Sequence, residues 1–207
     1  MSIAKMRAGA ARWDLLQHSF YQRWTAGELS MSELQNYACQ YRFVVSAMPR
    51  WLAAAAATSA DDRAGLVQHS REETPHVDLW HDFARAVGVT DADLASSQPN
   101  AATQALLDLG DDLVTRGLGA AAVWALEVQT PRVSVQKLAG LGQYGVEPGA
   151  GTRYFEVHQA MDVRHTEDLE AVVARTGRPA ESTAAGAAMS EALWDILTSV
   201  ERDVARA

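Results

Sequence analysis

Apolar side chains recur at the three- to four-residue spacing of amphipathic helices along almost the whole chain, and no alternating pattern typical of strand pairs stands out. Residues 90–100 are expected to form a connection with one helical turn at 91–94, and residues 140–151 a glycine-rich loop. Helices are predicted at residues 4–24, from 30 to beyond 45, and at 61–87, 101–115, 120–128, 133–141, 152–175 and 181–206. The chain is therefore predicted to be all-α, with seven or eight helices in a single domain, residues 1–207.

A few residues predict where these helices begin, bend and end. Ser30 and Glu33 have the spacing of a capping box and are expected to open the second helix. Proline removes a backbone donor, so Pro49 is expected to bend or divide that helix and Pro75 to distort the next one. Gly88 is expected to end the helical pattern that continues past Pro75.

Composition narrows the classes of function. The formal net charge is −8, which argues against a nucleic-acid partner because phosphate binding needs clustered Lys and Arg. No apolar run approaches the length that spans a bilayer, and charged residues interrupt residues 1–31, so we predict neither a membrane segment nor a signal peptide. Cys39 is the single cysteine, which excludes an intrachain disulfide, and we expect a cytoplasmic location.

The strongest chemical signal lies in the segment that contains His158, Asp162 and His165. Their i, i+4, i+7 spacing places two imidazoles and a carboxylate on one face of a helix. Nitrogen and oxygen ligands of this kind suit Fe(II) and similar cations at reactive sites. The segment therefore predicts a metalloprotein, and specifically an iron enzyme.

A second candidate pair is Glu73 and His76, spaced i, i+3 on either side of Pro75. Helical carboxylate-bridged di-iron sites use Glu-x-x-His pairs because one helical turn brings both side chains to the same metal. Glu72, at i, i+4 from His76, is an alternative to Glu73, and His69 lies on the same face.

The third candidate is Glu127, an acidic residue in an otherwise apolar helix. A buried carboxylate needs a cation, a proton or hydrogen-bond donors. The simpler explanation for Glu127 is an ion pair with Arg132 or Arg164, and His18 and His81 are taken as structural or surface residues. Together the candidates provide three carboxylates and three imidazoles for two Fe(II) ions: Glu73, His76, Glu127, His158, Asp162 and His165.

This order of ligands resembles that of the haem-oxygenase-like di-iron oxidases, whose seven-helix fold is shared by the pyrroloquinoline quinone synthase and thiaminase-II (TenA) families. The resemblance extends from about His18 to Leu169. It implies a haem-oxygenase-like helical bundle in which the six candidates bind iron, with O2 as co-substrate. By analogy with this fold we also expect a homodimer.

A narrower resemblance is to the Chlamydia protein associating with death domains and its bacterial relatives. That group is known for making p-aminobenzoate (4-aminobenzoate) for folate synthesis from its own side chains. The segments that carry the resemblance are Phe20–Gly27, Glu127–Arg132, Gln136–Lys137, Gly140–Gly145 and Tyr154–His158.

The narrower resemblance implies roles for residues of this chain. Tyr21 would be the sacrificed tyrosine, Tyr37 a second pocket tyrosine and Lys137 the amino donor. Several members of the group place their first glutamate where this chain has His69, so the carboxylate here must come from Glu73 or Glu72. The metals expected are two Fe, or one Fe and one Mn, with an external reductant.

Three alternatives use the same fold. The first is a di-iron oxidase that cleaves, decarboxylates or N-oxygenates a free amino acid or fatty acid. The second is a metal-free thiaminase-like hydrolase, which would need a catalytic cysteine, and Cys39 does not match that position. The third is a non-enzymatic interaction protein, for which the surface pattern gives no support.

Overall fold

The predicted all-α architecture is confirmed. The computed structural model describes residues 3–205, and within them it has eleven α-helices, three short 3₁₀-helices and no strand. The first five α-helices are α1 (Ile3–Ala10), α2 (Ser19–Ala26), α3 (Met31–Thr58), α4 (Arg63–Glu73) and α5 (His76–Ala86). The other six are α6 (Asp91–Ser96), α7 (Ala101–Thr115), α8 (Gly119–Glu127), α9 (Thr130–Leu141), α10 (Ala150–Arg175) and α11 (Pro179–Ala205).

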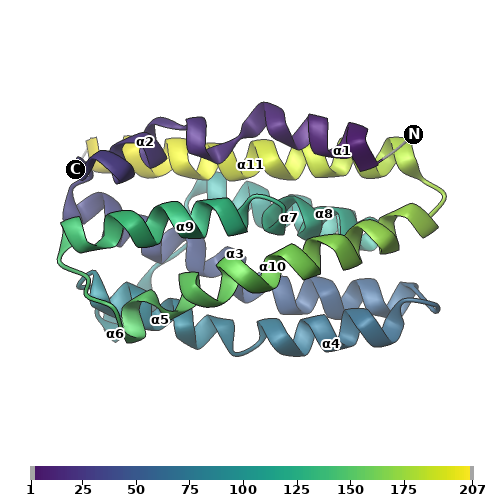
Figure 1. The fold of residues 1–207 in the computed structure, drawn as a ribbon, viewed down its shortest axis with the longest axis horizontal. Helices are drawn as coiled ribbons and strands as arrows, with labels where there is room; N and C mark the ends of the chain where they lie inside the picture. Colours follow the sequence, from purple (N-terminus) through teal and green to yellow (C-terminus); the bar gives the residue numbers. More distant parts are fainter. Residues whose placement is uncertain (1–2, 206–207) are drawn as a thin grey trace.

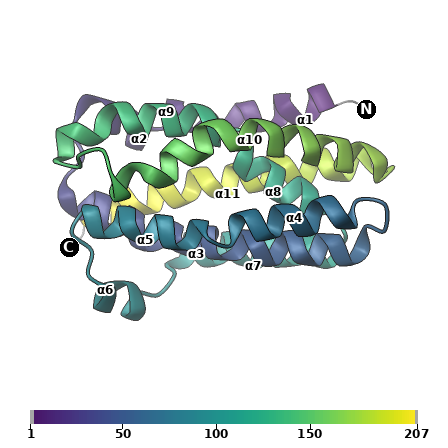
Figure 2. The same cartoon turned by 60° about the horizontal axis from the view of Figure 1, so that its bottom comes forward.

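Helix α3 runs through the bundle and contacts α4, α5, α7, α8 and α11. Helices α1 and α2 lie along α11 at one edge of the view in Figure 1, and α4 and α5 follow one another along the opposite edge. Helix α10 packs against α5, α8 and α9. Figure 2 shows that the short helix α6 projects from the end of this bundle.

The first predicted helix, residues 4–24, is wrong as a single element. Helix α1 is followed by the 3₁₀-helices η1 (Ala11–Trp13) and η2 (Leu15–Gln17) before α2 begins. The side chain of Asp14 accepts a hydrogen bond from the backbone N–H of Leu16, and His18 Nδ1 accepts one from that of Phe20. These side-chain caps begin two new elements, η2 after Asp14 and α2 after His18, and apolar spacing alone does not predict them.

Two prolines have different effects on their helices. Helix α3 opens with the predicted capping box of Ser30 and Glu33, and it continues through Pro49 without being divided there. The expected penalty of about 3 kcal/mol for an interior proline is offset by tertiary packing, because α3 buries Met48 and Trp51 beside it. Pro75, by contrast, separates α4 from α5, so the predicted helix at 61–87 is two helices.

Other boundaries agree closely with the sequence. Helix α7 has the predicted bounds, and α6 includes the turn predicted at 91–94. Gly88 follows α5 with φ of 88°, a left-handed conformation that favours glycine. The loop predicted at 140–151 is shorter than expected, because α9 continues to Leu141, η3 covers Gly142–Tyr144 and α10 begins at Ala150.

The buried apolar side chains form one contiguous core. Trp51 illustrates how tightly this core is packed, since a Cβ added at Gly110 on α7 would overlap its indole ring. The core extends around a set of buried polar residues between α4, α5, α8 and α10. Within residues 3–205 no helix has the length and apolar character needed to cross a membrane.

Candidate metal centre

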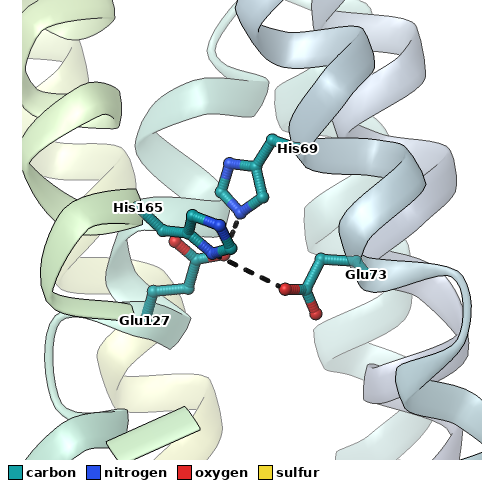
Figure 3. A group of neighbouring side chains, drawn as sticks. All are labelled: His69, Glu73, Glu127 and His165. Atoms are coloured by element: carbon teal, nitrogen blue, oxygen red, sulfur yellow. Dashed lines mark hydrogen bonds and ion pairs between the residues drawn. The ribbon is translucent and has the colours of Figure 1, made fainter. Parts of the chain in front are cut away.

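Imidazoles and carboxylates gather in two groups that share Glu73. Within each group the potential ligand atoms all lie within 4.8 Å of one another. Figure 3 shows the side chains of the first group pointing toward one another, with His69 and Glu73 on α4, Glu127 on α8 and His165 on α10. The first group is His69, Glu73, Glu127 and His165, and the second is Glu73, His76 and His158. A carboxylate common to both groups is the arrangement expected when one residue bridges two cations.

Helix α10 presents His158, Asp162 and His165 on its buried face, as their spacing predicts. Each of the three side chains is at most 2% exposed. Asp162 lies at the edge of the first group, with Oδ1 3.8 Å from Nδ1 of His165. The helix therefore contributes to both groups from a single face.

Helices α4 and α5 supply the opposite wall. Glu73 is the last residue of α4 and His76 the first of α5, so the pair predicted on one helix lies on either side of the break at Thr74–Pro75. Nδ1 of His76 remains 3.0 Å from Oε2 of Glu73. His69, one turn earlier on α4, points into the same space. The break therefore keeps the pair in contact.

Glu127 ends α8 and is fully buried. Its Oε1 lies 2.8 Å from Nε2 of His69. The alternative ion pairs with Arg132 and Arg164 are not formed, because Arg132 pairs with Asp14 and Arg164 with Glu72. Glu127 therefore faces the histidine–carboxylate cluster.

Many polar atoms of the cluster are buried and have no hydrogen-bond partner. Such atoms are rare in proteins because each costs about 1–3 kcal/mol when left unpaired. The unpartnered atoms in the cluster are Glu73 Oε1, Glu127 Oε2, His158 Nε2, both carboxylate oxygens of Asp162 and His165 Nδ1. All are potential metal ligands, so the donor set fits a cation at this place.

Hydrogen bonds assign opposite tautomers to two of the imidazoles. His158 Nδ1 lies 2.6 Å from the backbone carbonyl of Tyr154 and must donate its proton there, which leaves Nε2 as a free lone pair. His165 Nε2 lies 2.9 Å from a carboxylate oxygen of Glu72, which leaves Nδ1 free. In both residues the free nitrogen faces the cluster, 3.7 Å from a carboxylate oxygen of Glu73.

The carboxylates influence one another strongly. Burial raises the pKa of Glu127 and Asp162 well above the usual range, and the negative charge of Glu73 raises both further. Burial also raises the pKa of Glu73, but the facing imidazoles of His158 and His76, when protonated, outweigh it and hold that pKa well below its usual value. A bound cation would stabilise the ionised form of all three carboxylates.

Glu72 lies outside both groups. It is half-buried, and its carboxylate accepts hydrogen bonds from Gln68 and His165 and pairs with Arg164 at 3.1 Å. Of the two glutamates that the sequence leaves open, the structure thus places Glu73 inside the cluster and Glu72 behind His165.

A chain of hydrogen bonds joins the three residues predicted to be reactive. Nζ of Lys137 donates to the hydroxyl of Tyr37 at 2.6 Å, and the Tyr37 hydroxyl lies 3.3 Å from that of Tyr21. Burial lowers the pKa of Lys137 well below its usual value and raises those of both tyrosines. Burial therefore favours the neutral form of the amine and of both phenols.

Packed aromatic rings connect this chain to the cluster. The indole of Trp80 lies 5.6 Å from the ring of Tyr37 and 4.9 Å from that of Tyr154, measured between centroids. Tyr154 in turn stacks on the imidazole of His158, with centroids 3.9 Å apart and an interplanar angle of 24°. A cavity of about 20 Å³ lies beside these residues and is bordered by Tyr21, Lys137 and Tyr154.

Residues 35–195 match the model of a haem-oxygenase family that is described as iron-containing redox enzymes. The chain belongs to this family. The match begins within α3 and ends within α11, so it includes every helix that contributes to the cluster. A donor set of buried imidazoles and carboxylates is consistent with iron as the metal of such an enzyme.

Curated relatives of this iron-containing redox enzyme carry the name 4-aminobenzoate synthase. The protein from Chlamydia pneumoniae is 32% identical over 197 residues, which are 89% of this chain and 88% of that protein. The protein from Nitrosomonas europaea is 30% identical over 212 residues, covering 91% of this chain and 86% of its own length.

Solved structures share the fold. A TenA homologue from Pseudomonas syringae superposes with a TM-score of 0.84 at 18% identity, over 97% of this chain and 91% of that one. A domain with a haem-oxygenase-like fold from Shewanella denitrificans gives a TM-score of 0.76 at 16% identity, over 99% and 94% of the two chains. The predicted haem-oxygenase-like bundle is thereby confirmed.

His69 is the residue of the cluster that sequence reasoning left outside the ligand set. A signal for it exists, because His69, Glu73 and His76 repeat the i, i+4, i+7 spacing of the triplet on α10. Cys39 is half-buried in a separate hollow beside Asp93 and Ser97. It borders neither the metal cluster nor the cavity beside Lys137, as the poor match to a thiaminase nucleophile predicted.

Proposed function

We propose that this chain is an iron-dependent 4-aminobenzoate synthase that builds its product from its own Tyr21 and Lys137. The observation that carries the proposal is the buried hydrogen-bonded chain of Lys137, Tyr37 and Tyr21, packed through aromatic rings against a histidine of the cluster. Relatives named 4-aminobenzoate synthase at 30–33% identity support the identity of the product.

We propose two metal positions within the cluster. His69, Glu127 and His165 would hold one ion, His76 and His158 the other, and Glu73 would be shared between them. Asp162 would add a further carboxylate from α10. The ions would be two Fe, or one Fe and one Mn, and when bound they would supply the capacity to oxidise an aromatic side chain with O2 and an external reductant.

The side chains of the reactive chain have complementary tasks. Lys137 is enclosed without a carboxylate partner, and burial favours its neutral amine, which has a lone pair for forming a bond to carbon. Tyr37 orients that amine through its hydroxyl and holds the phenol of Tyr21 by the same oxygen. The surrounding rings of Phe155 and Trp80 cover Nζ and leave beside it only a cavity of about 20 Å³.

The size of the cavity argues against a free organic substrate at this place. A volume of about 20 Å³ is close to that of one water molecule, whereas pockets for small-molecule ligands are typically about 300–1,000 Å³. The small volume therefore supports a reacting ring that the protein already contains, and Tyr21 borders the cavity.

The experiment that tests this function begins with protein loaded anaerobically with Fe(II), alone or with Mn(II). After O2 and reductant are added, 4-aminobenzoate is measured by mass spectrometry together with the peptide that carries Tyr21. We expect at most one product molecule per chain, and the modified peptide should appear in the same proportion.

Tyr21→Phe should retain metal and form no product. The matched control is Tyr144→Phe, because Tyr144 is partly buried but lies outside the cavity and the reactive chain. Product that forms over many turnovers while Tyr21 stays intact would instead identify an enzyme that acts on a free substrate. A cytoplasmic location and a homodimer remain predictions from the sequence.

A further inference from the structure

A second, larger cavity lies between α4 and α10, on the side of the cluster away from the tyrosines. Its volume is about 310 Å³. Its lining includes the imidazoles of His69 and His165, which belong to the first group of the cluster. Gly65 and Ala171, both exposed, form part of its walls. The cavity therefore joins the protein surface to two residues of the cluster.

Acidic groups outnumber basic groups in the lining of this cavity. Four carboxylates and two guanidinium groups border it: Asp61, Asp62, Glu72 and Asp168, with Arg164 and Arg175. Each guanidinium is paired with a lining carboxylate, Arg164 with Glu72 and Arg175 with Asp62. The excess negative charge attracts cations, and a hollow with low-dielectric walls concentrates that attraction.

Glu72 stands at the inner end of the cavity. Its side chain is 23% exposed, whereas that of His165, to which it is hydrogen-bonded, is 2% exposed. The other ring nitrogen of His165, Nδ1, has no hydrogen-bond partner and lies 3.7 Å from a carboxylate oxygen of Glu73. A cation that entered from the surface would thus meet the partly buried carboxylate of Glu72 before the buried free lone pair of His165.

We propose that this cavity is the port through which divalent metal ions enter the buried centre, with Glu72 as the carboxylate that passes them to His165. The inference rests on the metal centre proposed above and adds a route to it. The cavity beside Tyr21 is far smaller, with a volume of about 20 Å³ against about 310 Å³. On that side, moreover, the stacked ring of Tyr154 covers His158.

A bulky side chain in the port should slow metal entry and leave the affinity of the buried centre unchanged, so the two quantities can be measured separately. A Cβ added at Gly65 meets no atom within 4 Å, so Gly65→Phe adds a ring at the wall of the cavity without displacing the core. The matched control is Gly142→Phe, since Gly142 is also exposed, also has open space around its Cβ and lies outside the cavity. Phenylalanine has a better helix propensity than glycine, so α4 should remain intact.

The measurement is the rate at which metal-free protein takes up Co(II), followed by the visible absorption of the bound ion. We expect Gly65→Phe to load more slowly than Gly142→Phe and to reach the same final metal content by elemental analysis. Equal loading rates for the two variants would overturn the port.

A second variant tests the charge of the port without filling it. The double substitution D61N/D168N should lower the second-order loading rate by about two- to tenfold at low ionic strength, and the difference should shrink in salt. A loading rate equal to wild type at low salt would count against the port. Failure of the wild-type protein to retain Co(II) or Fe(II) at all would overturn the metal centre itself, which is a different result.

Discussion

Replacing Lys137 by methionine is expected to stabilise the metal-free fold and to abolish product formation. Methionine keeps the length of the side chain and removes the amine. In the structure Nζ is fully enclosed, and it donates a hydrogen bond to the hydroxyl of Tyr37. That hydroxyl keeps Tyr21 as a neighbour at 3.3 Å after the substitution, so no buried phenol loses its last partner.

The size of the effect follows from proton binding. Burial lowers the pKa of Lys137 in the folded protein well below its ordinary value of 10.5. Between the lowered pKa and 10.5 the unfolded chain binds a proton that the folded chain does not, so this group makes the protein less stable as pH falls through that window. At neutral pH the amine therefore opposes folding, and we expect Lys137→Met to raise the free energy of unfolding by roughly 1–3 kcal/mol.

The assay is urea unfolding of chelator-treated protein at about pH 7 and about pH 9, where the gain should be smaller because removing the proton from the unfolded lysine costs less free energy as pH approaches 10.5. Lys5→Met is the matched control, since Lys5 is the other lysine of the chain and is exposed. It should change stability by less than about 0.5 kcal/mol at either pH. A Lys137→Met protein that is less stable than wild type at pH 7, or a gain that does not change with pH, would refute the reasoning.

Two further substitutions test the ligand set and the core. Glu73 belongs to both groups, so Glu73→Gln should lower the metal content at both positions. Glu72 only hydrogen-bonds the ligand His165, so Glu72→Gln should weaken metal binding by about 10–100-fold, as is typical when the partner of a ligand histidine is changed. Elemental analysis decides between them, and a larger loss in Glu72→Gln would make Glu72 the ligand. In the core, Gly110→Ala should destabilise the protein by about 1–3 kcal/mol because the added methyl group overlaps Trp51. Gly65→Ala should instead stabilise the protein by up to about 1 kcal/mol, because the space around its Cβ is open. Urea unfolding measures both effects, and equal stability changes in the two variants would contradict the prediction.

The part of the site that depends on regular helical spacing was predictable from the sequence. His158, Asp162 and His165 occupy one face of α10 because the helix is uninterrupted between Ala150 and Arg175. Glu127 was a candidate for a different reason, because a buried carboxylate needs a cation, a proton or hydrogen-bond donors, but the sequence left an ion pair with Arg132 or Arg164 open. The family resemblance added Lys137, whose burial an amphipathic pattern alone does not indicate.

The rest depends on contacts between segments that are distant in sequence. The break at Thr74–Pro75 leaves Glu73 and His76 in contact, and whether Glu72 or Glu73 points inward depends on how α4 packs against α10. The interruption between α1 and α2 is set by side-chain caps at Asp14 and His18, which compete locally with the helix. Apolar periodicity does not contain this information.

The burial of Tyr21 has a consequence for the lifetime of the protein. Its ring packs against Phe20 and Trp24, with centroids 5.4 Å and 6.4 Å away, and is part of the contiguous core. A chain that gives up this ring becomes the equivalent of a large-to-small core variant, which typically loses about 3–5 kcal/mol of a total stability of about 5–15 kcal/mol. Spent chains would therefore unfold more often and be degraded sooner, so that the supply of product would follow the rate at which the protein is synthesised.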